Sequence, residues 1–247
     1  FQGKQVIRLQ DLMILNIILT NRWERPIYFA LAGNPVDRIG LDDFLQMQGM
    51  ALEVIPVRRN PTDRYNMNLP LIEKNLLTEN INPSKYYQPG FLFRNLNHPD
   101  LNIEEQAQDM IDTYRAIYSM AARQYVASNP EKAKKYISTM RQRIPYEVMP
   151  MNFNLLLDVL DMTNQINDKE NFEYFSGIVI KEANKQLALN PANTEMLNVL
   201  AWIYERNLEY SKALDIYKKF LALTPNDQNL LGRIAYIESL LKDSTKK

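Results

Sequence analysis

Apolar and polar residues alternate in two different periods along the first third of the chain. Between Val6 and Thr20 the apolar residues recur at helical spacing, which predicts an amphipathic helix that ends at Asn21. The β-branched and aromatic run in 25–30, which starts at a proline, predicts a strand. A second strand is expected over 51–57.

Two shorter elements are expected between these strands. Gly33-Asn34-Pro35 is typical of a turn, and 41–46 predicts a short helix with two acidic residues in its first turn. The region then has one hairpin-like or parallel strand pair packed on two helices. We expect a small α/β region over residues 4–100.

Prolines and asparagines are frequent from Arg58 to Asp100, and this composition favours a partly extended, partly helical connector. Its aromatic residues are expected to fix the connector to the body of the protein. These residues are Tyr86, Tyr87, Phe91 and Phe93.

From Ile103 the pattern is helical almost to the end, and one short motif recurs. Leu187-Ala188-Leu189-Asn190-Pro191 returns 34 residues later as Leu221-Ala222-Leu223-Thr224-Pro225. Thirty-four residues is the tetratricopeptide period, and the interval resembles that repeat. Ala201 and Ala213 are small enough for two antiparallel helices to approach closely, and Tyr204 and Tyr217 fill the space beside them.

Residues 101–247 are therefore predicted to form a mainly α domain of tetratricopeptide-like helical repeats, an α-α superhelix. A less regular helix pair is expected over 114–145 and another over 150–191, and 228–241 would cap the stack. The alternative is a plain helical bundle whose apolar spacing imitates a repeat.

Charge and composition exclude several classes of function. The 29 basic residues balance the 29 acidic residues, so the chain lacks the positive surface that nucleic-acid binding requires. The absence of cysteine removes disulfides and thiolate metal sites. The longest apolar runs are shorter than the ~20 residues needed to span a bilayer, and we expect a soluble fragment.

No catalytic site, metal site or cofactor site is predicted. His98 is the only histidine and lies in a turn sequence, where a solvated loop residue is the usual case. Asp42-Asp43 and Glu104-Glu105 fall in first turns of predicted helices, where acidic residues complement the helix dipole. The seven glycines form no phosphate-binding loop. An enzyme whose site is not visible in the sequence is the weakest of the alternatives.

A binding surface is predicted on the first helix of each pair, which lines the concave face of such arrays. Its aromatic members are of the type that binding hot spots favour. The alternative is that Trp202 and Tyr118 only fill the gap between neighbouring repeats. The predicted contact residues are Arg115, Tyr118, Tyr125, Asn198, Trp202 and Glu205.

Three blocks of residues resemble the extracytoplasmic C-terminal region of a family of bacterial multi-pass membrane proteins related to protein O-mannosyltransferases. They are Arg8–Leu15, the segment Asn21–Ala30 with its Arg25-Pro26-Ile27-Tyr28-Phe29-Ala30 core, and Gln48–Pro56. The helix pair around Arg115 and Glu131-Lys132-Ala133 continues the likeness, which covers most of residues 5–145.

This resemblance implies a parent protein with membrane helices similar to those of lipid-linked-sugar glycosyltransferases and with its catalytic acid outside this fragment. The present region would face the periplasm at the bacterial inner membrane. Its partner would be a polypeptide or the membrane portion of the same protein. Phe1-Gln2-Gly3 look like the tail of an engineered protease-cleavage tag, so the native sequence is expected to begin near Lys4 as part of a longer chain. An independent tetratricopeptide scaffold or adaptor is the alternative function.

Overall fold

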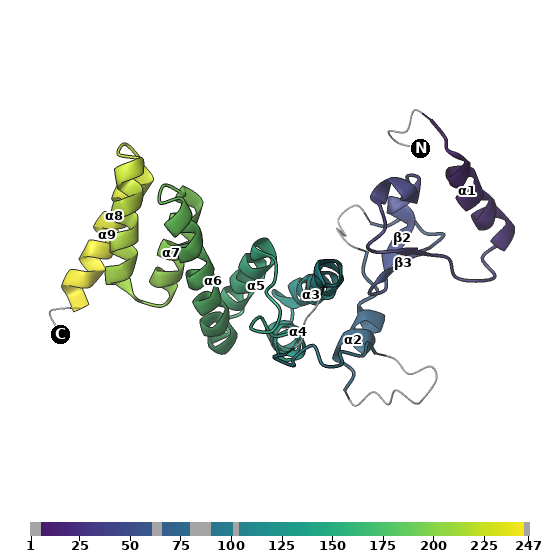
Figure 1. Cartoon of the computed structure of the whole chain (residues 1–247), viewed down its shortest axis with the longest axis horizontal. Coiled ribbons are helices and arrows are strands. Elements are labelled where there is room, and N and C mark those ends of the chain that lie inside the picture. Colours follow the sequence, from purple (N-terminus) through teal and green to yellow (C-terminus); the bar gives the residue numbers. More distant parts are fainter. Residues whose placement is uncertain (1–5, 61–65, 80–89, 101–103, 245–247) are drawn as a thin grey trace. The chain divides into compact units, whose positions relative to one another are not determined.

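The computed structural model describes residues 6–60, 66–79, 90–100 and 104–244, and the described part is mainly helical with a small sheet near the N-terminus (Figure 1). The chain divides into two compact units, Phe1–Leu155 and Leu156–Lys247. The sequence predicted a division near residue 100. The difference arises because the first long helix pair packs with the N-terminal region.

The first helix, α1 (Leu9–Asn21), matches the predicted one and has defined ends. The Arg8 backbone N–H donates to the Asp11 carboxylate at 2.9 Å, which satisfies one of the free donors at the helix start. Arg22 and Trp23 adopt left-handed backbone conformations with φ of 50° and 63°. Two such residues in succession end the helix and redirect the chain toward the sheet.

The sheet has three antiparallel strands in the order β1-β3-β2, namely β1 (Tyr28–Ala30), β2 (Leu45–Met47) and β3 (Ala51–Val54). Both predicted strands are present but shorter. The predicted helix over 41–46 is wrong, because only a 3₁₀ turn (η2, Asp42–Phe44) forms before β2 begins. Leu45 and Met47 are buried on one face of β2, and Gly49 (φ 106°) makes the turn to β3.

The turn predicted at Gly33-Asn34-Pro35 is the start of a second 3₁₀ turn, η1 (Pro35–Arg38). The Asn34 side chain accepts a hydrogen bond of 3.0 Å from the Val36 backbone N–H. Proline at the first position has its φ already fixed, so this short turn is well defined by its own sequence.

Three helices complete the first unit: α2 (Leu69–Leu77), α3 (Glu105–Tyr125) and α4 (Pro130–Arg143). α2 packs against both α3 and α4 and buries Ile72 and Leu76 completely. The rings of Phe91 and Phe93 pack edge-on against Tyr114 at 5.2 and 5.4 Å, which confirms that these aromatic residues fix the connector. Tyr86 and Tyr87 lie outside the described residues.

The second unit is a series of helices, of which α7, α8 and α9 each pack on the helix before. The helices are α5 (Phe153–Gln165, which begins at the boundary), α6 (Lys169–Leu189), α7 (Thr194–Arg206), α8 (Tyr210–Leu223) and α9 (Gln228–Ser244). The Asp168 and Asn193 side chains cap the starts of α6 and α7. The expected terminal helix over 228–241 is present as α9.

Small and aromatic residues pack between α7 and α8 as the sequence predicted. Ala201 and Ala213 are fully buried, and Tyr217 is buried beside them with Tyr204 partly buried at the edge of the cluster. Ile237 of α9 closes this core. No helix in the described ranges is long and apolar enough to cross a membrane.

Candidate binding sites

An open pocket of about 560 Å³ lies on the second unit where α7, α8 and α9 meet. Its wall combines the aromatic rings of Tyr217 and Phe220 with amide, hydroxyl, carboxyl and guanidinium groups. The polar lining residues are Thr194, Glu195, Asn198, Asp227, Asn229 and Arg233. A concave surface with apolar walls and a few fixed polar groups is the general form of a ligand site.

Glu205 holds two walls of this pocket together. Its carboxylate accepts a hydrogen bond of 2.6 Å from the Tyr217 hydroxyl and one of 2.7 Å from Arg233 Nε. A second bond from Arg233 Nη2 makes that ion pair bidentate. Only 9% of the Glu205 side chain is exposed, against 47% of Arg233.

The electrostatics of this cluster follow from burial and pairing. Burial alone would raise the pKa of Glu205, but the hydrogen bonds from Arg233 and Tyr217 outweigh it and lower the pKa. Burial, together with the adjacent carboxylate, raises the pKa of Tyr217 to about 12. Glu205 is therefore ionised in neutral solution, and its carboxylate holds the Arg233 and Tyr217 side chains in place.

The three predicted residues of α7 have different positions. Asn198 is exposed in the lining of the pocket, and Glu205 lies behind its wall. Trp202 is half-buried, and its ring packs edge-on against Phe172 of α6 at 5.9 Å. This contact agrees with the alternative interpretation, in which Trp202 fills the gap between neighbouring helix pairs.

Arg115 is fully buried in the first unit and is not at the surface that the sequence predicted for it. Its guanidinium donates to the carbonyl oxygens of Ile144 and Pro150, each at 3.2 Å, and to that of Met149. It also pairs with Asp112 at 2.9 Å. These bonds hold the segment between α4 and α5 against α3, which is a structural task.

Tyr118 is likewise fully buried, and its hydroxyl donates a bond of 2.8 Å to the Leu76 carbonyl while accepting one of 3.1 Å from Arg143. Burial raises the pKa of Tyr118 to about 12. Tyr125 is half-buried, and its ring stacks on Tyr136 at 6.0 Å with planes 11° apart. The predicted stripe on α3 is thus mainly part of the core, and only Tyr125 reaches solvent.

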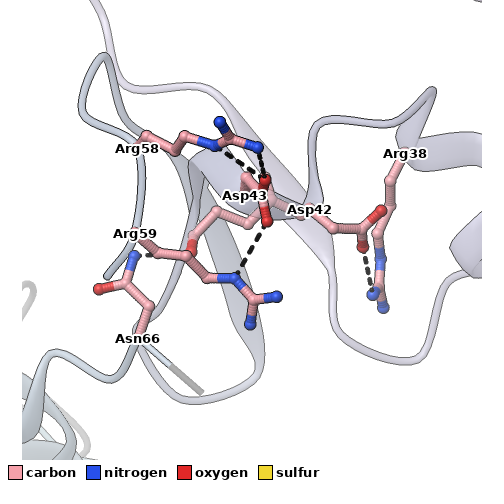
Figure 2. Close-up of polar contacts among 7 residues, drawn as sticks. Arg38, Asp42, Asp43, Arg58, Arg59 and Asn66 are labelled. Atoms are coloured by element: carbon pink, nitrogen blue, oxygen red, sulfur yellow. Dashed lines mark hydrogen bonds and ion pairs between the residues drawn. The ribbon is translucent and has the colours of Figure 1, made fainter. Parts of the chain in front are cut away.

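A second polar cluster lies beside the sheet in the first unit (Figure 2). Asp43 accepts hydrogen bonds of 2.9 Å from Arg58 and 3.2 Å from Arg59, and Arg38 pairs with Asp42 at 3.2 Å. The bonds from Arg58 and Arg59 lower the pKa of the Asp43 carboxyl. The Asp43 bonds therefore connect the turn at 42–44 to the segment after β3, and the Asp42 pair connects the same turn to the end of η1.

The remaining candidates for chemistry are isolated. His98 is exposed, and its Nδ1 accepts a weak bond of 3.4 Å from the Asp100 backbone N–H. Glu104 is the N-cap residue of α3, as expected for an acid at a helix start. No group of three metal-binding side chains occurs within the described residues.

A comparison with known protein families matches the N-terminal part of the chain. A family model described as TMEM260-associated domain 2, a domain of unknown function, matches residues 1–71. The matched segment contains α1, the three-stranded sheet and the Asp43 cluster. No curated protein matches the chain.

Proposed function

We propose that this chain is a non-catalytic, extracytoplasmic interaction domain of a membrane protein related to protein O-mannosyltransferases. Support comes from the resemblance carried by residues 8–56, all of which lie within the matched family segment. On this proposal the catalytic site belongs to another part of the parent protein. The helices of the second unit hold a partner near it, at the periplasmic side of the bacterial inner membrane.

We infer that α7 and α8 form a helix pair of the tetratricopeptide type and that their neighbours extend the stack. The 34-residue spacing of the Pro191 and Pro225 motifs supports this inference. The burial of Ala201 and Ala213 between the two helices supports it as well. In such stacks the first helix of a pair presents its outer residues to the ligand, and Asn198 has that position on α7.

The pocket lined by Asn198 carries the proposal of a polypeptide partner. An exposed amide can donate to and accept from a peptide backbone at once, and Thr194 beside it adds a hydroxyl group. The rings of Tyr217 and Phe220 offer apolar area for a partner side chain. This mixture suits an extended peptide better than a sugar phosphate, because the one basic residue of the lining, Arg233, is neutralised by Glu205.

The test is a peptide array of extended segments from periplasmic proteins, probed with the wild-type chain and with Asn198→Arg. We expect a subset of peptides to bind the wild type and to lose at least about tenfold in affinity with the variant, which corresponds to about 1.4 kcal/mol. The arginine would fill the pocket mouth without disturbing the core, because Asn198 is exposed.

Asn154→Arg is the matched control, since Asn154 is an exposed asparagine on α5 that does not line the pocket. It should bind the same peptides as the wild type. Equal loss in both variants, or no peptide that distinguishes wild type from Asn198→Arg, would overturn the assignment of this pocket.

A further inference from the structure

Apolar side chains are exposed in unusual number around α1. The described residues expose eighteen large apolar side chains, and eight of them lie between Val6 and Trp23. Leu9 and Leu19 are each 75% exposed. Scattered single apolar residues are normal on a surface, but a contiguous patch marks a site of contact. The exposed members are Val6, Ile7, Leu9, Leu12, Met13, Ile17, Leu19 and Trp23.

Within α1 the exposed side chains are uncharged, and Gln10 and Asn16 add two exposed amides to the apolar ones. The only charged residue within α1 is Asp11, which is fully buried and paired with Arg8 at 2.9 Å. The Thr20 hydroxyl donates to the Asn16 carbonyl at 2.7 Å within the helix, so this polar group is satisfied without water. Removal of this outer face from water therefore moves no charge, and the amides of Gln10 and Asn16 set its polar cost.

The length of α1 and the residues at its C-terminal end fit a lipid surface. Its thirteen residues measure about 20 Å, which is too short to cross the ~30 Å hydrocarbon core of a bilayer. At its C-terminal end Trp23 is 51% exposed, and its exposed neighbours Arg22, Glu24 and Arg25 carry two positive charges and one negative charge. Tryptophan and arginine are enriched where hydrocarbon meets the headgroups.

An apolar cleft of about 220 Å³ continues the same surface. Ile18 and Trp23 form one side of it, and Phe44, Val54 and Pro56 are among the residues that line the rest. Because these side chains are apolar, the cleft offers space for hydrocarbon and no partner for a polar ligand.

We propose that α1 lies in the surface of a bilayer with anionic lipids, its apolar face among the acyl chains and its arginines at the headgroups. Charge complementarity favours this occupant over an apolar protein surface, because Arg22 and Arg25 outnumber Glu24 beside the exposed tryptophan, and Asp11 within the helix is paired with Arg8. The proposal is separate from the peptide pocket, which lies in the other unit.

Lipid vesicles test it directly with the full chain. We expect the chain to co-sediment with vesicles of equal parts phosphatidylcholine and phosphatidylglycerol, and less with phosphatidylcholine alone. In a Trp202→Phe background, the emission of Trp23 should shift to the blue on addition of the mixed vesicles, because its ring leaves water.

Leu12→Glu combined with Ile17→Glu should weaken vesicle binding at least about tenfold. Both residues are exposed, so the variant should keep the circular dichroism of the wild type. Leu189→Glu combined with Leu208→Glu is the matched control, since both leucines are exposed in the second unit, and it should bind like the wild type. Arg22→Gln combined with Arg25→Gln should abolish the preference for the anionic vesicles.

Three results would overturn the proposal: no binding of the wild type to either vesicle, equal binding by the α1 variant, or an α1-dependent dimer in sedimentation that vesicles do not dissociate. The last result would identify a second copy of the chain as the occupant of this surface.

Discussion

The hydroxyl of Tyr217 on α8 donates a 2.6 Å hydrogen bond to the carboxylate of Glu205 on α7. The same carboxylate is held by Arg233 of α9. One partly buried acid therefore connects three successive helices, at the wall of the candidate peptide pocket. The stability of this corner and the shape of the pocket depend on the same few bonds.

Tyr217→Phe removes one of these bonds and keeps the ring in place. We expect the free energy of unfolding to fall by about 1 kcal/mol, because Glu205 keeps its ion pair with Arg233. Urea denaturation at neutral pH measures the change. Tyr236→Phe is the control, since Tyr236 is an exposed tyrosine of α9, and it should be neutral. An equal effect of the two substitutions would contradict the role of the bond.

Stability should depend on acid through Glu205. The folded pKa of Glu205 lies below its ordinary value of 4.5, so its contribution is fully present above pH 4.5 and is lost as the pH falls through the lowered folded value. The difference in free energy of unfolding between wild type and Glu205→Gln should therefore shrink below pH 4.5. Urea titrations over a pH series test this, with Glu195→Gln, an exposed acid of α7, as the control. A difference that stays constant with pH would argue against the assignment.

Arg115→Met should be strongly destabilising, by about 3 kcal/mol or more, because it removes donors from buried carbonyl oxygens. Hydrogen exchange of the 144–150 segment should rise, which separates a local loss from general unfolding. Lys135→Met, at an exposed position of α4, should leave both quantities unchanged. Protection of 144–150 equal to that of the wild type would show that Arg115 does not hold this segment.

Ala213→Leu tests the close approach of α7 and α8. Its Cβ is fully buried in the contact between the helices, so added atoms must push them apart at a cost of about 1–3 kcal/mol. Ala222→Leu makes the same change at an exposed position of the same helix and should have little effect. Thermal unfolding of the two variants gives the comparison.

The sequence predicted the helices better than the sheet, for a physical reason. Helical spacing extends over many residues, as in α7 and α8, so one contrary residue does not hide it. β2 has only three residues and follows Asp42-Asp43, which are typical of a helix start. β2 is stabilised by its pairing with β3, and the spacing of residues within 41–46 cannot predict a contact with another segment.

Of the predicted contact residues, some are exposed and others are covered by a neighbouring helix. Asn198 lies in the pocket, but Trp202 packs on Phe172 of the preceding helix. Arg115 follows Ile111 by four residues and precedes Ala122 by seven, so its position on the apolar face was visible in the sequence. The charge of arginine argued for the surface, yet three backbone carbonyl oxygens and Asp112 satisfy it inside.

The place of Arg233 in the pocket lining could not be predicted from the sequence, because this residue belongs to α9, the helix that follows the α7–α8 pair. Glu205, which forms an ion pair with Arg233, was predicted to contact a binding partner instead. The spacing of Glu205 and Arg233 is 28 residues, which no local pattern connects.

The ion pairs of Arg8 connect the start of α1 to η1. Arg8 contacts Asp11 within its own helix and reaches Asp37 of η1 at 2.7 Å, with both Arg8 and Asp37 partly open to solvent. Added salt screens exposed charges more than buried ones, so the Arg8–Asp37 link should weaken at high ionic strength while the pair of Arg8 with the buried Asp11 is affected less.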